Sequence, residues 1–300
     1  MDYTRLGATG LKVSRLCLGC MTYGSKQWRP WILDEEESRP FIRRALELGI
    51  NFFDTADMYG GGQSEEFLGR ALGKRRANVL IATKFGMLPG GKPSGAKPEY
   101  VRQAAEASLR RLGTDYIDLY QIHVPDPDTP IADTLGALDE LKRAGKVREI
   151  GCSNFSAEQI RQARRFASVQ NEYSLLHREP EKDVLPECER SGIAFLPYFP
   201  VASGLLTGKY RKGQPPPAGA RIQPGGYFDK IFTDENLSKV ESLMEFAASK
   251  KHTLLEVAIA WLLTRPVVAS VIAGATSPDQ VHANAGAARW NPDAKEFASI

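Results

Sequence analysis

The amino-acid sequence predicts an α/β protein built as a (β/α)₈ barrel, the TIM-barrel architecture, with an N-terminal β-hairpin and a long loop at the face where the strands end. Short apolar runs rich in strand-forming residues alternate eight times with segments of helical period, which is typical of parallel strands joined by crossover helices. The length of 300 residues matches one closed barrel. We therefore expect a single barrel domain over residues 1–300.

The predicted strands are mostly apolar on both faces, as parallel strands must be when helices cover the sheet. They fall at residues 14–20, 51–56, 79–85, 117–123, 147–153, 168–173, 193–199 and 268–274. A predicted hairpin at residues 3–14 precedes the barrel strands, in a position to cap the N-terminal end of the barrel.

The segments between the strands carry helix start and stop signals. Ser64 and Ser156 put a capping hydroxyl ahead of acidic residues, and Gly113 stands where a left-handed helix end is favoured. The predicted helices cover residues 34–48, 64–72, 98–112, 130–144, 156–166 and 180–190. Residues 213–229 contain three consecutive prolines and several glycines, which predicts a functional loop over the active face.

Composition and charge exclude several classes of function. Lys and Arg number 39 against 36 Asp and Glu, without a dense basic stripe, so no nucleic-acid partner is expected. No apolar run approaches the roughly 20 residues that span a bilayer, so we expect no membrane partner and a cytoplasmic location. The four cysteines and four histidines lack the spacing of a disulfide framework or a metal site.

Three consecutive predicted strands end in a polar residue, at the face where the active sites of barrel enzymes lie. These residues are Asp54, Lys84 and His123, and Tyr59 follows Asp54 in the next loop. Each has an ordinary interpretation by itself, as a turn former, a surface lysine, a buried histidine or loop packing. An acid, a base, an imidazole and a phenol at one barrel mouth together indicate a catalytic site.

These side chains suit proton donation to a carbonyl oxygen while a hydride reaches the carbonyl carbon. A free phenol has a pKa of about 10, so Tyr59 needs a neighbouring cation to stabilise its phenolate. Lys84 would supply that cation, and Asp54 would keep it charged and in place. His123 would orient the carbonyl. No side chain delivers a hydride, so the reaction requires a nicotinamide cofactor.

The sequence around these residues resembles the aldo-keto reductases, including the branch that contains the potassium-channel β-subunits. The similarity is strongest at residues 49–60, 112–123 and 145–155, and it extends from residue 3 to residue 284. It implies an NADPH-dependent carbonyl reductase whose catalytic tetrad is Asp54, Tyr59, Lys84 and His123.

The resemblance also implies which residues bind the dinucleotide. We expect NADPH rather than NADH, a preference that depends on Lys209, Arg221 and the hydroxyls of Thr276 and Ser277. Ser277 stands where several relatives have Arg or Lys, as does Gln280. The implied cofactor contacts are Thr22, Asp54, Ser153, Asn154, Gln170, Tyr198, Leu205, Gly208, Lys209, Arg221, Gly274, Thr276, Ser277, Gln280 and Asn284.

Apolar and aromatic residues near the barrel mouth predict a pocket for a neutral aldehyde or ketone. They are Tyr23, Trp28, Trp31, Met58, Met87, Val124 and Tyr227. Two alternatives stay open: a nicotinamide-binding regulatory module with slow or no turnover, and an enzyme that oxidises an alcohol with Tyr59 as the base. The sequence also leaves the oligomeric state open.

Overall fold

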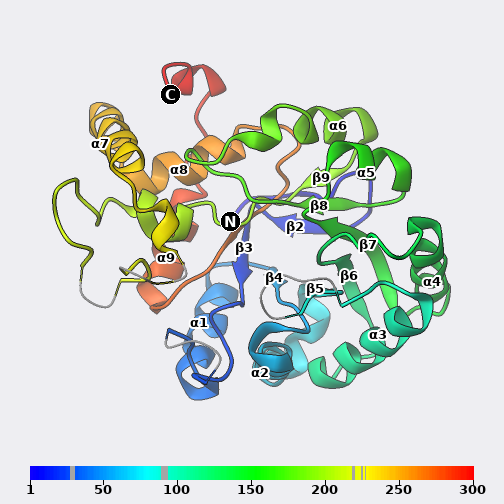
Figure 1. Cartoon of the computed structure of the whole chain (residues 1–300). Helices are drawn as coiled ribbons and strands as arrows, with labels where there is room; N and C mark the ends of the chain where they lie inside the picture. Colours follow the sequence, from blue (N-terminus) through cyan, green and yellow to red (C-terminus); the bar gives the residue numbers. More distant parts are fainter. Residues whose placement is uncertain (28–30, 89–93, 218–219, 224–225, 227) are drawn as a thin grey trace.

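Eight parallel strands form the inner sheet of the protein, and helices surround it (Figure 1). The computed structural model describes residues 1–27, 31–88, 94–217, 220–223, 226 and 228–300. Around the sheet the strand order is β10, β3, β4, β5, β6, β7, β8 and β9. The bounds are β3 Leu16–Gly19, β4 Phe52–Asp54, β5 Leu80–Phe85, β6 Ile117–Ile122, β7 Val147–Ser153, β8 Ser168–Gln170, β9 Ala194–Phe195 and β10 Val271–Ala273.

Backbone hydrogen bonds between the two outermost strands close the sheet. Phe195 of β9 donates its N–H to the carbonyl of Val267 at 2.8 Å and accepts from the N–H of Ala269 at 3.1 Å. The N–H of Ile272 in β10 donates to the carbonyl of Pro197 at 3.0 Å. These bonds join the two edges, and the predicted (β/α)₈ barrel is confirmed.

The strands at this seam are shorter than the sequence predicts. The pattern indicates strands over residues 168–173 and 193–199, whereas β8 and β9 end at Gln170 and Phe195. Beyond these ends an isolated bridge connects the two segments, in which the N–H of Tyr198 donates to the carbonyl of Asn171 at 3.1 Å and the N–H of Tyr173 donates to the carbonyl of Tyr198 at 3.3 Å. The chain turns there into loops at the barrel mouth, so the ladder does not continue.

Six helices match the predicted ones, with small shifts at their ends. α5 ends at Ala163 because Arg164 adopts a left-handed φ of 47°. α6 begins at Val184, since residues Glu179–Glu181 form a separate 3₁₀ turn. The bounds are α1 Glu35–Glu47, α2 Gln63–Leu72, α3 Pro98–Leu112, α4 Ile131–Arg143, α5 Ala157–Ala163 and α6 Val184–Ser191.

Three further helices follow the long loop: α7 Asp234–Ser249, α8 Leu254–Leu263 and α9 Pro278–Ala287. The start of α9 coincides with a segment expected to bind the cofactor, whereas α7 and α8 are not among the helices predicted from the sequence. Nearly every side chain of α8 from Val257 to Leu262 is buried. A helix that is apolar on all sides lacks the amphipathic period by which a helix is recognised.

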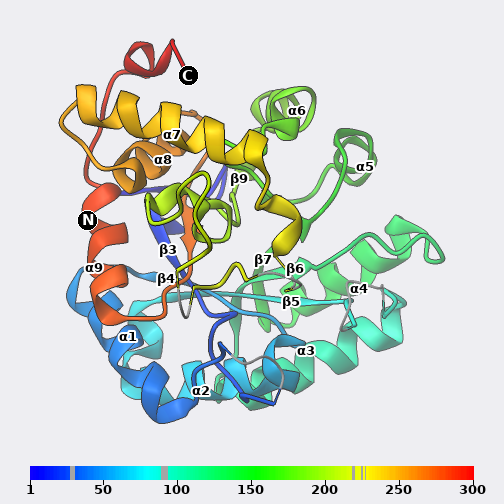
Figure 2. The ribbon, with the colours of Figure 1, turned by 60° about the vertical axis from the view of Figure 1, so that its left-hand side comes forward.

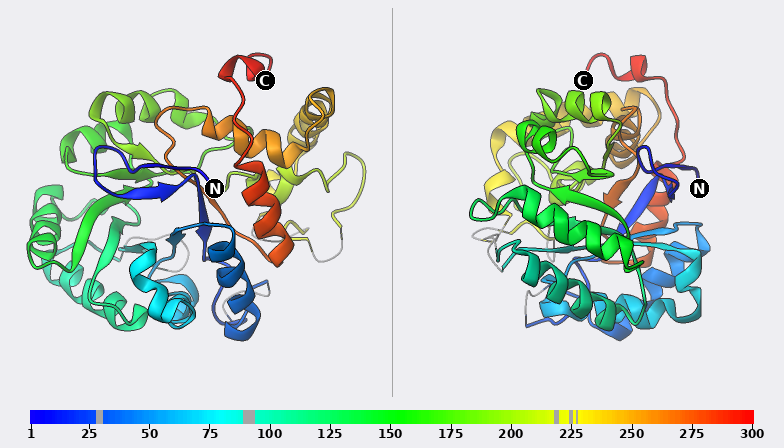
Figure 3. Two further views of the ribbon diagram at one scale, coloured as in Figure 1. Left: turned by 180° about the vertical axis from the view of Figure 1, so that it is seen from behind. Right: turned by 90° about the vertical axis from the view of Figure 1, so that its right-hand side faces the viewer.

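The first residues form the predicted hairpin, in which β1 Tyr3–Arg5 pairs antiparallel with β2 Lys12–Ser14. Its side chains Leu6, Leu11 and Val13 are buried in one cluster with the side chains that fill the barrel. The hairpin therefore plugs one end of the barrel. In the right-hand view of Figure 3 the blue hairpin and the yellow loop before α7 lie on opposite sides of the molecule.

The opposite end carries the loops that follow the strands. Figure 2 shows the segment before α7, in yellow, passing beside the barrel strands on the same side as the loop that follows β3. Among the residues that the structure describes, no helix is long and apolar enough to cross a membrane.

Candidate active site

Four polar side chains meet at the mouth of the barrel, and we call Asp54, Tyr59, Lys84 and His123 the tetrad. Asp54 is the last residue of β4 and Lys84 lies near the end of β5. His123 directly follows β6, and Tyr59 opens the 3₁₀ turn Tyr59–Gly62. All four are buried. Parallel neighbouring strands bring their carboxyl ends to one edge, so the expected convergence of these residues is seen.

Lys84 is the centre of the tetrad. Its ammonium Nζ donates to Asp54 Oδ1 at 2.6 Å, to the carbonyl of Thr55 at 2.9 Å and to the phenol oxygen of Tyr59 at 3.4 Å. These three acceptors use all three donors of the ammonium group. The buried lysine thus keeps its charge, and it directs one donor at the phenol.

Asp54 has partners on both carboxylate oxygens. Its Oδ2 accepts from Gln170 Nε2 at 2.8 Å and from Gln121 Nε2 at 3.5 Å. Gln170 is among the site residues predicted from the sequence, whereas Gln121 is not. A polar side chain inside the apolar run of β6, in register with Lys84 of β5, is the signal that identifies Gln121.

Burial and charge set the protonation states of the tetrad. Burial would lower the pKa of Lys84, but the charge of Asp54 and then Tyr59 raise it above its usual value, so the ammonium persists. Burial raises the pKa of Tyr59, and the positive charge of Lys84 opposes that rise only in part. The phenol therefore holds its proton at neutral pH. Burial, and then Lys84, lower the pKa of His123 well below its usual range, so the imidazole is neutral.

The His123 ring packs edge-on against the Tyr59 ring, with the centroids 5.9 Å apart. Hydrogen bonds of the main chain fix the position of His123. The backbone N–H of His123 donates to the carbonyl of Phe85 at 2.8 Å, and the backbone carbonyl of His123 accepts from Asn154 Nδ2 at 2.9 Å. Within the described part of the chain, His123 Nδ1 is buried without a hydrogen-bond partner.

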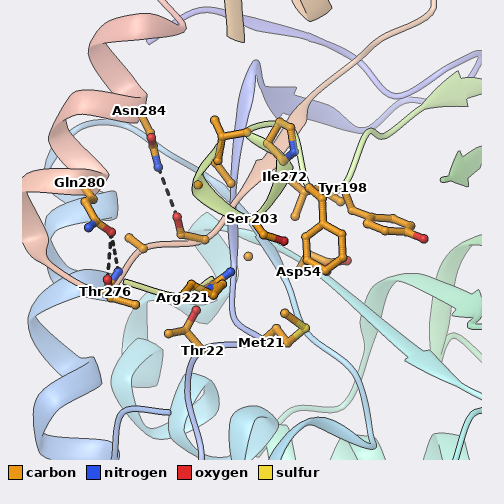
Figure 4. A pocket seen from close by; sticks show the side chains of 18 of the residues that line it. Met21, Thr22, Asp54, Tyr198, Ser203, Arg221, Ile272, Thr276, Gln280 and Asn284 are labelled. Atoms are coloured by element: carbon orange, nitrogen blue, oxygen red, sulfur yellow. Dashed lines mark hydrogen bonds between the residues drawn. The ribbon is translucent and has the colours of Figure 1, made fainter. Parts of the chain in front are cut away.

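A cavity of about 720 Å³ opens beside the tetrad and extends to α9. Figure 4 shows Asp54 and Tyr198 on one side of it and Thr276, Gln280 and Asn284 on the other. Most residues that the sequence predicts as site residues line this cavity. They are Thr22, Trp31, Asp54, Met58, Tyr59, Met87, His123, Ser153, Asn154, Gln170, Tyr198, Lys209, Arg221, Gly274, Thr276, Gln280 and Asn284.

Several predicted residues do not line this cavity. Tyr23 is fully buried and packs against Phe41, with ring centroids 5.7 Å apart, because the chain turns its neighbour Thr22 toward the cavity instead. Leu205 is buried in the apolar core, and Ser277 caps α9 by accepting from the N–H of Gln280 at 3.3 Å. Val124 and Gly208 also lie outside the lining, and Trp28 and Tyr227 fall outside the described residues.

Asn154 organises the wall next to the tetrad. It has a left-handed φ of 62°, and its N–H donates to the side chain of Asn171 at 2.7 Å. Its Oδ1 accepts from the phenol of Tyr198 at 2.8 Å. Strain of this kind in a residue other than glycine is typical of functional sites, where the surroundings enforce the geometry.

Helix α9 begins at the far end of the cavity. Gln280 Oε1 accepts from the N–H of Thr276 at 2.8 Å and from its hydroxyl at 3.2 Å, and Asn284 Nδ2 donates to the carbonyl of Gly274 at 3.4 Å (Figure 4). These bonds fold residues 274–276 against the helix. The helix N-terminus carries partial positive charge, which suits a phosphate.

Lys209 and Arg221 both line the cavity. Burial, and then the positive charge of Arg221, lower the pKa of Lys209 below its usual value. Gly204, which also lines the cavity, has a left-handed φ of 103°, a conformation that favours glycine. This donor set suits an anionic group with several oxygens.

Aromatic rings line the outer part of the cavity. Arg221 lies 4.6 Å over the Trp31 ring, and the rings of Trp31 and Phe228 are 6.3 Å apart. Phe199 contacts Phe228 edge-on at 5.6 Å, so the long loop rests on the segment after β9. Phe199 is not among the site residues predicted from the sequence. The described residues contain no cluster of three or more metal-type ligands.

Comparison with known proteins identifies the family. The model of the Aldo/keto reductase family matches residues 15–300. A probable voltage-gated potassium channel subunit beta from Arabidopsis thaliana is 36% identical over 302 residues, which cover 95% of this chain and 90% of the relative. An NADH-specific methylglyoxal reductase from Escherichia coli is 36% identical over 310 residues, which cover 95% of this chain and 93% of the relative.

A solved structure agrees with this assignment. The holo form of an aldo-keto reductase from Bacillus halodurans aligns with a TM-score of 0.81 and 35% identity, over 99% of this chain and 95% of that one. The chain therefore belongs to the aldo-keto reductase family. The family consists of oxidoreductases that act on carbonyl groups with nicotinamide cofactors.

Proposed function

We propose that this protein transfers a hydride from NADPH to a neutral aldehyde or ketone, with Tyr59 as the general acid. The observation that carries the proposal is the buried chain from Asp54 through Lys84 to the Tyr59 phenol at the edge of the cavity. A phenol that keeps its proton at neutral pH, beside a cation that can stabilise the phenolate, is the arrangement that proton donation requires.

Each tetrad residue has a defined task in this proposal. The Tyr59 phenol gives its proton to the carbonyl oxygen of the substrate, and the Lys84 ammonium at 3.4 Å stabilises the phenolate that is left. Asp54 keeps Lys84 charged and fixed. The neutral His123 ring, next to Tyr59, donates a hydrogen bond that orients the same carbonyl oxygen.

The cavity fits an extended dinucleotide. The bound nicotinamide would supply the hydride. Ser153, Asn154 and Gln170, which line the cavity, would hold its carboxamide, and Tyr198 would stack on its ring. Lys209 and Arg221 would bind the pyrophosphate. At the start of α9, Gly274, Thr276, Gln280 and Asn284 line the cavity and would bind the adenosine end.

The preference for NADPH over NADH depends on a small number of groups. Lys209, Arg221 and Thr276 line the cavity, where they supply two positive charges and a hydroxyl. The Ser277 hydroxyl lies outside the lining and caps α9, so it would have to turn to reach a 2′-phosphate. Gln280 is already engaged with Thr276. Because one relative is named as NADH-specific, the two cofactors have to be compared directly.

The wall beside the tetrad favours an apolar or aromatic carbonyl compound. Met58 and Met87 line the cavity, with Trp31 and Phe228 in its outer part, and none of these four side chains offers a charge to a carboxylate substrate. We therefore expect medium-sized neutral aldehydes and ketones to be better substrates than acidic ones.

The test is the oxidation of NADPH in the presence of aromatic, aliphatic and acidic aldehydes, run beside NADH and beside Tyr59→Phe. Tyr59→Phe should lower kcat by roughly a factor of 10² to 10⁴ because it removes the acid, while the Kd for NADPH changes by less than about twofold. Full turnover by Tyr59→Phe would remove Tyr59 from the mechanism.

The alternative is a regulatory module that binds the cofactor without turnover. The name of the Arabidopsis relative favours this possibility. Tight NADPH binding by the wild type with no carbonyl reduced across the whole panel is the result that would support it over the reductase.

A further inference from the structure

A second group of charged side chains, one buried and two partly buried, is connected to the strand that carries Lys84 and has no task in the proposed reaction. It consists of Asp57, Glu65 and Arg111. Asp57 is two residues before Tyr59, Glu65 is in α2 and Arg111 is in α3. The N–H of Asp57 donates to the carbonyl of Lys84 at 3.0 Å, so Asp57 is joined directly to the strand that carries the tetrad lysine.

Glu65 connects the helix layer to the same strand. It is fully buried, its Oε2 accepts from Arg111 Nε at 2.6 Å, and its Oε1 accepts from the hydroxyl of Thr83 at 2.6 Å. Thr83 is adjacent to Lys84 in β5. The ion pair therefore fixes Arg111 relative to the backbone of the tetrad lysine.

Arg111 in turn supports the turn that carries Tyr59. A β-carbon on Gly62, in the 3₁₀ turn Tyr59–Gly62, would lie 2.6 Å from Arg111 Cδ and 2.8 Å from Nε. The guanidinium side chain thus packs directly on this turn. One continuous set of contacts runs from Lys84 through Thr83, Glu65 and Arg111 to the turn that presents the phenol.

Asp57 adds a second carboxyl group to this site. Its Oδ1 is buried and has no hydrogen-bond partner among the described residues. Two carboxyl groups and one guanidinium leave one excess negative charge if both acids ionise, in a place that water reaches poorly. The charged and titratable groups that face Asp57 are Glu65 on α2, Arg111 on α3, Lys84 on β5 and Tyr120 on β6.

The protonation of Asp57 follows from these surroundings. Burial, and then the charge of Glu65, raise the pKa of Asp57 to about 7, although Arg111 opposes this rise. The buried phenol of Tyr120 likewise lacks a partner in the described part of the chain. The geometry and the charge count both favour a neutral Asp57 below neutral pH.

We propose that Glu65, Arg111 and a protonated Asp57 form a positioning network that holds Tyr59 against Lys84. Ionisation of Asp57 places a second negative charge beside Arg111, draws the guanidinium away from Glu65 and loosens the turn that carries Tyr59. The inference rests on the proposed function, since it assigns the network a task through Tyr59.

The first test compares the pH profile of kcat in the wild type and in Asp57→Asn, whose amide has the shape of a protonated carboxyl and cannot ionise. The wild type should lose roughly tenfold in kcat as the pH rises through about 7, with KM changed less. Asp57→Asn should keep the acid-side rate through this range. Loss caused by Tyr59 itself comes at more alkaline pH, because the pKa of Tyr59 is raised above its usual value.

The second test breaks the ion pair and uses a matched control. Glu65→Gln should lower kcat roughly tenfold with KM nearly unchanged, because the amide keeps its place but loses the charge that holds Arg111. Glu35→Gln is the control, since Glu35 of α1 forms a more exposed ion pair, at 2.9 Å, with Arg70 of α2, the helix that also carries Glu65. If Glu65→Gln does not fold, Arg111→Lys is the second variant. It keeps the positive charge but loses the guanidinium group that packs on the turn Tyr59–Gly62, so it should show the same loss in kcat.

A measurement without turnover separates this inference from the proposed function. The ring-carbon NMR signal of Tyr59, assigned by its loss in Tyr59→Phe, should shift with a midpoint at pH about 7 in the wild type and show no such step in Asp57→Asn. This result supports the network even if no carbonyl substrate is found. A Tyr59 signal that is flat near that pH, or the same step in Asp57→Asn, overturns the network even if the reductase is established.

Discussion

At the scale of single residues, partners decide which charges can remain inside the barrel. Asp54 is almost fully buried, yet one oxygen accepts from Lys84 at 2.6 Å and the other from Gln170 at 2.8 Å. A buried ion pair with every donor and acceptor used is tolerated, whereas one partner left alone is costly. Removal of one partner of this ion pair should therefore lower stability.

Lys84→Met tests how far the buried charge of Asp54 depends on its partner Lys84. The substitution leaves the carboxylate of Asp54 buried with amide partners only, so the free energy of unfolding should fall by about 3–5 kcal/mol. The double variant Lys84→Met/Asp54→Asn should recover part of that loss, because it removes the unpaired charge. Chemical denaturation measures both values. A double variant that is less stable than Lys84→Met would contradict this account.

At the scale of elements, the hairpin depends on one glycine for its fit to the barrel. Gly7 has a left-handed φ of 55°, and a β-carbon there would lie 2.8 Å from the carbonyl oxygen of Ala167 and 2.9 Å from that of Gly192. The backbone of the hairpin thus lies directly on the ends of the segments before β8 and β9. Only glycine allows both the conformation and this close approach.

Gly7→Ala should lower the free energy of unfolding by about 1–3 kcal/mol, since it adds backbone strain and a clash with two carbonyl groups. Gly10→Ala is the matched control in the same hairpin, because no atom lies within 4 Å of a β-carbon at that position. Urea denaturation of the two variants gives the comparison. Equal stability of the two variants would contradict the close contact of Gly7 with the carbonyl groups of Ala167 and Gly192.

The position of a residue relative to strands and helices decides how well the sequence predicts its place in the structure. Asp54, Lys84 and His123 could be predicted as site residues from the sequence, because the carboxyl ends of consecutive parallel strands have to meet. The direction of a loop side chain follows no regular pattern in the sequence. The sequence therefore did not show that Thr22 faces the cavity while Tyr23 is buried. α8 escaped prediction for a related reason, since a helix buried on all sides has no amphipathic pattern.

At the scale of the whole molecule, closure of the barrel assembles the cavity from distant segments. Thr22 follows β3, Lys209 follows the 3₁₀ segment Ala202–Thr207 and Asn284 lies in α9, yet all three line one space. No local pattern places them together. The resemblance to a family supplied these positions in advance, whereas the spacing of residues alone could not.

Lys209 offers a test of this assembled site. Lys209→Gln should raise the Kd for NADPH about ten- to a hundredfold, because it removes a charge-assisted contact from a partly buried anion site. The Kd of the variant should also depend less on salt than that of the wild type. Lys212→Gln is the control, since Lys212 is exposed, donates to Ser238 at 2.9 Å and lies outside the cavity lining. Fluorescence titration at low and high salt measures these constants, and equal Kd values for the two variants would place the dinucleotide phosphates elsewhere.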